Sequence, residues 1–156
     1  MNREKTVKEF HTLFNVPTVN TINDDSVNLL RVNLIREELK ELEQALQDRN
    51  AVEVLDALCD LQYVLSGTIE QLGFSKVFKQ AFKEVHNSNM SKACDSFDEA
   101  SATVDYYMKY RNTESTIHET KNNKYLVKRN LDGKVLKSIN YKPAKLNRFI
   151  DELDLQ

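Results

Sequence analysis

The chain carries two acidic clusters in close succession, Glu37-Glu38-Leu39-Lys40-Glu41 and Glu53-Val54-Leu55-Asp56, with Asp60 one helical turn further on. Residues three or four positions apart lie on the same face of a helix, so each cluster predicts a line of carboxylates along one helix. On two neighbouring antiparallel helices, these lines would form a cage of hard oxygen ligands. Mg²⁺ requires ligands of this kind.

The residues around the acids argue against a purely solvated acidic face, which is the commoner explanation of such clusters. At about 100° per residue, the first cluster shares a sector of its helix with Leu30, Leu34 and Ala45. The acids of the second helix form a line flanked by Ala57, Tyr63 and Val64. We therefore predict that the acids lie inside, in a partly dry site. Carboxylates facing one another there cannot all stay ionised without compensation, and divalent cations would supply it.

Composition indicates one helical domain and excludes several classes of protein. The 156 residues include only 3 Gly and 2 Pro, with 40% hydrophobic and 29% charged residues. A net charge of −2 argues against a nucleic-acid partner, and no apolar run is long enough to span a membrane. The first five residues lack the apolar stretch of a signal peptide, and the two cysteines have no metal-type spacing. We expect a cytoplasmic protein.

Hydrophobic periodicity predicts four helices in the first part of the chain. The first covers about residues 4–15, and the second is capped by Asp25 or Ser26. The third ends at Gly73, and the fourth runs from Ser75 to about Ser91. Short connections between amphipathic helices favour antiparallel neighbours, and hence a bundle.

The second part of the chain predicts a smaller, mixed addition. Ser96-x-x-Glu99 is a capping box for a fifth helix, and residues 113–123 look like a loop. Two short strands, 125–129 and 134–139, flank a Gly-containing turn, and a last helix covers 145–153. We therefore expect an all-α single domain over 1–156. Its four-helix bundle core covers about 4–92, and its extra helix and small C-terminal β-hairpin cover about 95–156.

The acidic clusters match the EExxE…ExxD pattern of the all-α nucleoside triphosphate pyrophosphohydrolases, a superfamily that includes MazG proteins, dimeric dUTPases and phosphoribosyl-ATP pyrophosphohydrolases. Further motifs resemble one MazG-like branch, often described as phosphoribosyl-ATP-pyrophosphohydrolase-like. They are Phe10-His11-x-x-Phe14-Asn15, Arg31-x-x-Leu34-Ile35, Asp56-Ala57-Leu58-Cys59-Asp60-Leu61-x-Tyr63-Val64, Val85-His86-x-Ser88-Asn89-Met90-Ser91-Lys92, Asp132-Gly133-Lys134-Val135-Leu136-Lys137-Ser138 and Tyr141-x-Pro143-Ala144-x-Leu146. The resemblance covers most of the chain and implies a MazG-like fold.

The resemblance also implies an activity and a set of site residues. It implies a Mg²⁺-dependent enzyme, with Mn²⁺ as a substitute ion, that cleaves a nucleoside triphosphate between the α and β phosphates. The implied metal ligands are Glu38, Glu41, Glu53 and Asp56. Glu37 and Glu38 are the implied catalytic acids. Glu37 either orients the attacking water or is an additional metal ligand, and Asp60 supports the metal ligands from behind. The implied phosphate-binding residues are Asn89, Lys92, Lys134 and Lys137.

Several functions remain open at this point. We favour house-cleaning hydrolysis of a canonical or damaged (d)NTP, because nothing in the sequence identifies a phosphoribosyl pocket. The alternatives are a phosphoribosyl-ATP pyrophosphohydrolase and a non-catalytic acidic bundle for protein interaction. A di-iron bundle is disfavoured because its Glu-x-x-His pairs are missing. Members of the superfamily commonly complete the site across an interface, so we expect a homodimer or a dimer of dimers.

Overall fold

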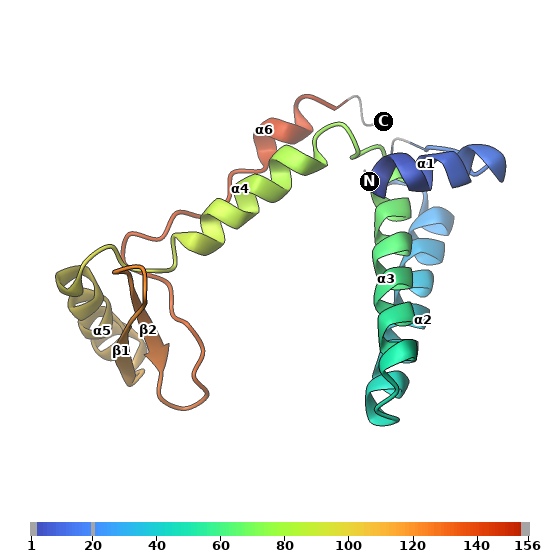
Figure 1. The fold of residues 1–156 in the computed structure, drawn as a ribbon. Helices are drawn as coiled ribbons and strands as arrows, with labels where there is room; N and C mark the ends of the chain where they lie inside the picture. Colours follow the sequence, from blue (N-terminus) through green and yellow to red (C-terminus); the bar gives the residue numbers. More distant parts are fainter. Residues whose placement is uncertain (1–2, 20, 154–156) are drawn as a thin grey trace. The chain divides into compact units, whose positions relative to one another are not determined.

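Helices dominate the fold in the computed structural model, which describes residues 3–19 and 21–153 (Figure 1). The elements are α1 (Arg3–Leu13), α2 (Asp25–Gln47), α3 (Ala51–Gln71), α4 (Phe78–Met90), α5 (Phe97–Arg111), β1 (Ser115–Glu119), β2 (Tyr125–Arg129) and α6 (Asn147–Ile150). The predicted class, all-α with a small C-terminal hairpin, is confirmed. Within the described part of the chain, no helix is both long and apolar enough to cross a membrane.

The chain divides into two compact units. The first contains the described residues up to Lys79 together with those from Asn147 onward, and the second covers Gln80–Leu146. Of the four helices predicted as the core, α1, α2 and α3 therefore belong to the first unit, while most of α4 belongs to the second.

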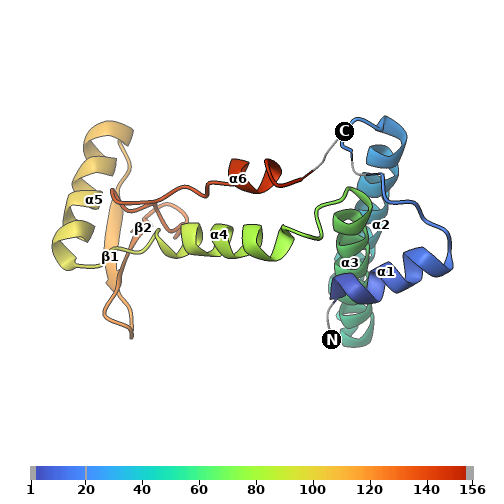
Figure 2. The same ribbon diagram turned by 90° about the horizontal axis from the view of Figure 1, so that it is seen from above.

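In the first unit, α2 lies beside α3 and α1 lies across α3 (Figure 2). The Asp24 carboxylate caps α2 by accepting from the N–H groups of Ser26 (3.0 Å) and Val27 (3.1 Å). Our prediction of Asp25 or Ser26 as the cap was therefore wrong by one or two residues. Asn50 caps α3 by accepting from the N–H of Val52 at 3.1 Å. The connection between the two helices is short, which makes them antiparallel neighbours.

Gly73 ends α3, as predicted. Its φ of 82° lies in the left-handed region that favours glycine. The Gly73 N–H donates to the carbonyl of Glu70 (3.1 Å), and the Phe74 N–H donates to that of Ile69 (2.9 Å). This pair of bonds satisfies carbonyls left open at the helix end. The next helix begins at Phe78 and not at the predicted Ser75, whose hydroxyl instead donates to the Glu70 carboxylate at 2.5 Å.

A polar network is buried where α1, α2 and α3 meet. The Arg31 guanidinium is 7% exposed and donates from Nε to the side-chain oxygen of Gln71. Its Nη2 lies 3.4 Å from Nε2 of His11, which is also buried. Gly67 makes room for both side chains, because a Cβ there would lie 3.1 Å from Arg31 Nη1 and 3.2 Å from His11 Nε2. The network therefore favours a residue without a large side chain at position 67 of α3.

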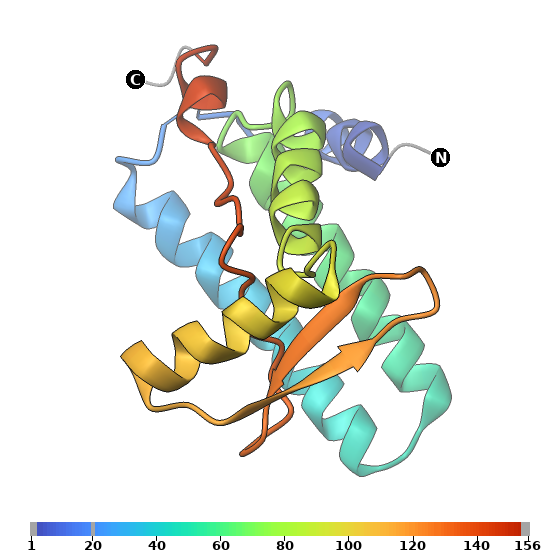
Figure 3. The same ribbon diagram turned by 90° about the vertical axis from the view of Figure 1, so that its left-hand side faces the viewer.

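The second unit has its own apolar core, made by Cys94, Ala100, Val127 and Leu136. The helix α5 begins as predicted, with the Ser96 hydroxyl accepting from the Glu99 N–H at 3.2 Å. The Glu99 carboxylate reaches one residue further back than a capping box requires and accepts from the Asp95 N–H at 2.9 Å. Figure 3 shows α5 lying beside the two strands.

The hairpin differs from the predicted one in its strands. β1 pairs antiparallel with β2, with Ile117 opposite Val127, so the prediction of a loop over 113–123 was wrong. Residues 134–139 return along β2 but form only an isolated bridge, between Lys128 and Val135. They do not continue as a strand, because beyond Leu136, whose N–H still donates to the Val127 carbonyl (2.8 Å), the N–H groups of Lys137 and Ile139 turn to α5. Lys137 donates to the Tyr107 hydroxyl (3.2 Å) and Ile139 to Thr103 Oγ1 (3.2 Å).

Candidate active site

The acids of the two clusters meet around Glu38. Glu38 lies in the middle of α2, is half-buried, and has a pKa raised above its ordinary value. Burial is the largest cause, followed by the negative charges of Glu41, Asp60, Glu37 and Asp56. Two of these neighbours stand on α2 and two on α3, so the antiparallel packing brings both clusters to one place.

Within the single chain, this site is more open than predicted. Glu37, Glu41, Glu53, Asp56 and Asp60 are all exposed, and only Glu38 is partly covered. The prediction that the acids lie inside was therefore wrong for the isolated chain. The apolar residues that share their helices are also exposed in many places, so the helix pair by itself does not enclose the acids.

Glu53 stands apart from the group around Glu38. It occupies the first turn of α3, where its N–H donates to the Asn50 cap at 3.4 Å. Its charge is not among those that raise the pKa of Glu38. The structure thus gathers five of the six acids of the clusters and leaves Glu53 at the edge.

The acids have the right chemistry for a hard cation. All are carboxylates, and none of the ion pairs among the described residues involves them. Oxygen donors with uncompensated negative charge suit Mg²⁺ better than a soft metal. In the part of the chain that is described, however, no three His, Cys, Asp or Glu side chains converge closely enough to form a metal cage. The carboxylates are therefore suitable donors for a divalent cation. They lie near one another in this structure, but they do not form a closed coordination site.

The predicted phosphate-binding residues all fall in the second unit. At the end of α4, Lys92 Nζ donates to the Asn89 side-chain oxygen at 2.8 Å, which confirms that these two residues are neighbours. Lys134 is exposed in a turn in which Arg129 binds the Asp132 carboxylate. This contact lowers the pKa of Asp132 to about 2. Lys137 points elsewhere, with its Nζ 4.3 Å from the centre of the Tyr141 ring. The two tail lysines therefore have different surroundings.

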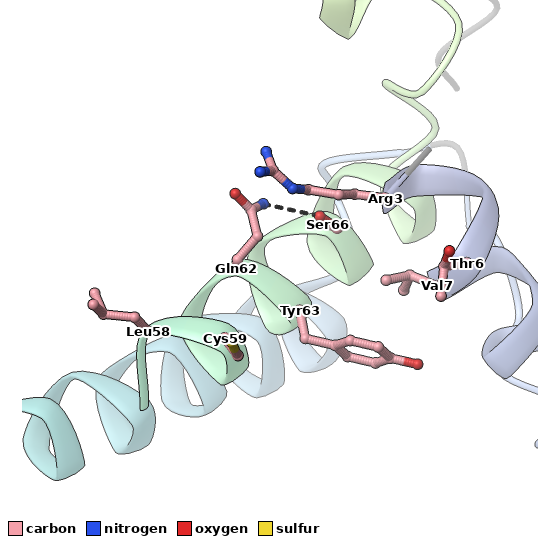
Figure 4. A pocket seen from close by; sticks show the side chains of 8 residues that line it. All are labelled: Arg3, Thr6, Val7, Leu58, Cys59, Gln62, Tyr63 and Ser66. Atoms are coloured by element: carbon pink, nitrogen blue, oxygen red, sulfur yellow. Dashed lines mark hydrogen bonds between the residues drawn. The ribbon is translucent and has the colours of Figure 1, made fainter. Parts of the chain in front are cut away.

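A cavity of about 400 Å³ lies between α1 and α3, beside the polar network of the first unit. Figure 4 shows its wall, made by Arg3, Thr6, Val7, Leu58, Cys59, Gln62, Tyr63 and Ser66. Gln62 donates to the Ser66 hydroxyl at 3.0 Å, and the Tyr63 ring packs edge-on against Phe10 with centroids 5.7 Å apart. Sequence reasoning missed this cavity, because the crossing of α1 over α3 that creates it has no local signature.

Sequence reasoning also left the histidines out of the site. His86 and His118 are exposed, whereas His11 is buried beside Arg31. Burial, with the Arg31 charge as the second cause, lowers the pKa of His11. Its Nδ1 has no hydrogen-bond partner among the described residues. The signal that could have found it was the pair of residues His11 and Arg31, each on a mostly apolar helix face.

An acidic helix pair of this kind is typical of the MazG-like all-α nucleoside triphosphate pyrophosphohydrolases, and comparison with known proteins supports that class. Residues 7–89, more than half of the chain, match the family model described as "Phosphoribosyl-ATP pyrophosphohydrolase". The chain therefore belongs to the phosphoribosyl-ATP pyrophosphohydrolase family, within the MazG-like superfamily. No curated protein matches the chain. The matched region contains all six acids, Asn89 and the whole of α1 to α3 after residue 6.

Proposed function

We propose that the chain hydrolyses a nucleoside triphosphate between the α and β phosphates, releasing a nucleoside monophosphate and pyrophosphate. Membership of a pyrophosphohydrolase family supports the reaction class. The observation that carries the proposal is the position of Glu38, half-buried among four other carboxylates from α2 and α3. A concentration of unpaired negative charge is costly for a fold unless a cation is bound there.

The family is typically metal-dependent, and we propose Mg²⁺ as the ion, with Mn²⁺ able to replace it. Glu38, Glu41, Glu53 and Asp56 would hold it. A bound Mg²⁺ neutralises triphosphate charge and lowers the pKa of a water molecule, which is the chemistry that attack at phosphorus needs. Glu53 would have to approach the other three, so we expect substrate or ion binding to draw it in.

The remaining acids have supporting roles in this proposal. Glu37 is exposed beside Glu38 and is free of ion pairs in the described structure, so it can accept a hydrogen bond from the attacking water and orient it. Asp60 lies close enough to raise the pKa of Glu38. We assign it to the support of the metal ligands.

Asn89 and Lys92 are proposed to bind the phosphates. Their mutual bond of 2.8 Å holds the ammonium in place and leaves the Asn89 amide N–H₂ free to donate. Lys134 and Lys137 are proposed to contact the substrate from the tail. Both are exposed and neither forms an ion pair among the described residues.

We also propose that the protein works as a homodimer or a dimer of dimers. Large apolar side chains remain exposed along α2 and α3, including Leu29, Leu30, Val32, Leu39, Leu46, Val52, Leu55, Leu58 and Leu65. Soluble monomers rarely leave so many on one helix pair. A second copy packed on these helices would bury this apolar surface. It would also cover the acids, so that the site would be enclosed in the assembly.

Two substrates fit this proposal. House-cleaning of a canonical or damaged (d)NTP is favoured, because the acids recognise only the phosphates and the ion. Phosphoribosyl-ATP is the second candidate, favoured by the description of the matching family. The test is a panel of ribo- and deoxyribonucleoside triphosphates with phosphoribosyl-ATP, assayed with Mg²⁺ and with EDTA. Mg²⁺-dependent turnover of any member supports the proposal, and the fastest member identifies the substrate. No turnover with either Mg²⁺ or Mn²⁺ would leave a non-catalytic acidic bundle.

A further inference from the structure

The second unit contains a cavity of about 360 Å³ between α5 and the segment 137–141, which we call the tail segment. It is lined by Tyr106, Tyr107, Arg111, Lys137, Ser138, Ile139 and Tyr141. Small-molecule sites usually start at about 300 Å³ and combine an apolar wall with a few polar groups. Every lining residue lies outside the matched region, so family membership does not account for this cavity.

Several bonds hold the cavity wall in shape. The tail segment is tied to α5 by the bonds of the Lys137 and Ile139 N–H groups described above and by the bond between the Ser138 hydroxyl and the Glu99 carboxylate. Tyr141 is fixed separately, because its hydroxyl lies 2.9 Å from the Ser88 hydroxyl. Such a preformed wall lowers the entropic cost of binding a ligand.

The chemistry of the wall combines aromatic rings with uncompensated positive charge. Arg111 and Lys137 form no ion pair among the described residues, and no carboxylate lines the cavity. Tyr106 is 40% exposed, and its ring lies edge-on to the Tyr107 ring (centroids 5.5 Å apart) and tilted against the Tyr110 ring (5.2 Å). The Tyr141 ring is covered by the Lys137 ammonium, which it keeps at the wall.

We propose that this cavity binds a nucleoside phosphate, with the base on the Tyr106 ring and the phosphates on Arg111 and Lys137. A ligand with a planar ring and an anionic group would contact both the aromatic and the cationic residues of the wall. Base stacking on an aromatic ring and a guanidinium–phosphate contact are each favourable. The inference rests on the proposed function for the class of ligand. It adds to that function a recognition site built by the second unit.

Lys109 provides a matched control for Arg111. Both residues stand in the last turn of α5, where a cation stabilises the helix end. Only Arg111 lines the cavity, whereas Lys109 Nζ lies over the Tyr110 ring at 5.1 Å. Replacing either residue by alanine removes the same charge from the same helix turn, so a difference between the two variants reports on the cavity.

The test is calorimetric titration of the full-length protein with ATP, GTP, CTP and UTP in excess EDTA, where metal-dependent hydrolysis is absent. We expect at least one nucleotide to bind. Arg111→Ala and Tyr106→Ala should each weaken binding by about tenfold, the effect of losing one charge-assisted or stacking contact. Lys109→Ala should change the dissociation constant by less than about twofold. Circular dichroism checks that each variant is folded.

Three results would overturn the inference. They are equal binding by wild type and Arg111→Ala, equal binding of inorganic triphosphate and the nucleotides, and binding of a single-stranded oligonucleotide alone. The proposed hydrolysis is measured separately, so the two proposals can fail independently. Loss of nucleotide binding in Arg111→Ala would support the cavity even if the wild-type protein hydrolysed nothing. Normal hydrolysis with unchanged binding in Arg111→Ala would reject the cavity alone.

Discussion

The buried guanidinium of Arg31 on α2 donates from Nε to the side-chain oxygen of Gln71, the last residue of α3. Gln71 is 3% exposed and Arg31 is 7% exposed, so water cannot replace this bond. No carboxylate is paired with Arg31 among the described residues. The amide of Gln71 is therefore a principal partner of a buried charge, and it connects the two helices that carry the acids.

Replacing Gln71 by alanine should destabilise the protein. The substitution leaves a buried guanidinium N–H without a partner, which costs about 1–3 kcal/mol. Urea denaturation followed by circular dichroism measures the change in the free energy of unfolding. Gln47→Ala, at the exposed end of α2, is the matched control and should stay within about 0.5 kcal/mol of wild type. Equal stability of the two variants would mean that the Gln71 contact contributes little.

His11 should make the stability depend on pH. Burial and the Arg31 charge lower its pKa in the folded state, with Glu70 acting weakly in the opposite direction. The unfolded chain therefore takes up a proton more readily than the folded one. Its contribution to stability is complete above the ordinary value of 6.5 and is lost as the pH falls below it.

The measurement is the free energy of unfolding between about pH 7 and about pH 5.5, for wild type and for His11→Gln. Wild type should lose more stability over this range than His11→Gln. His86→Gln removes an exposed histidine and should keep the wild-type slope. Equal slopes for wild type and His11→Gln would contradict the assignment.

The acids of the site should be needed for turnover but not for folding. Glu38→Gln and Asp56→Asn each remove one charge from the group around Glu38. We expect metal-dependent hydrolysis to fall at least about 100-fold, since even residues that only support metal ligands have effects of 10- to 100-fold. The metal-free variants should be at least as stable as wild type, because charge repulsion is relieved.

Glu43→Gln serves as the control for both variants. Glu43 is an exposed acid on α2 outside the predicted ligand set, and its removal should leave activity unchanged. Either site variant that keeps wild-type activity at saturating Mg²⁺ would remove its residue from the proposed ligands.

The exposed apolar face of α2 and α3 should be covered by a second copy of the chain. Leu55 is 64% exposed on α3, next to Asp56. Leu55→Glu should shift the protein toward monomer in light scattering and reduce activity. Leu131 is 88% exposed in the tail turn, and Leu131→Glu should leave the assembly unchanged. A wild-type protein that is monomeric and fully active at nanomolar concentration would contradict this prediction.

The sequence predicted the helical part of the fold well because its signals are local. Gly73 ends α3 and Ser96 caps α5 through contacts with residues less than one helical turn away. The structure has both at the predicted positions. The strand β1 was missed because only Ser115 and Ile117 are partly covered, and Ile117 is the one apolar residue in the segment. Its pairing with β2 and the turning of residues 137–139 toward α5 depend on contacts between distant residues.

The same distinction applies to the candidate site. The periodicity of the acids predicted that both clusters would lie together. In the structure the negative charges of Glu37, Glu41, Asp56 and Asp60 act on Glu38, whereas that of Glu53 does not. Burial was mispredicted because a helical wheel identifies the face of a helix but not what covers it. The network of His11, Arg31 and Gln71 joins three elements through polar side chains, and apolar periodicity carries no information about such contacts.

Product analysis tests the central claim most directly. The protein is incubated with Mg²⁺ and its best nucleoside triphosphate, and the products are separated by ion-exchange chromatography with a parallel pyrophosphate assay. Cleavage between the α and β phosphates predicts nucleoside monophosphate and pyrophosphate in equal amounts, in wild type and Glu43→Gln but not in Glu38→Gln. Formation of nucleoside diphosphate and orthophosphate would contradict the account.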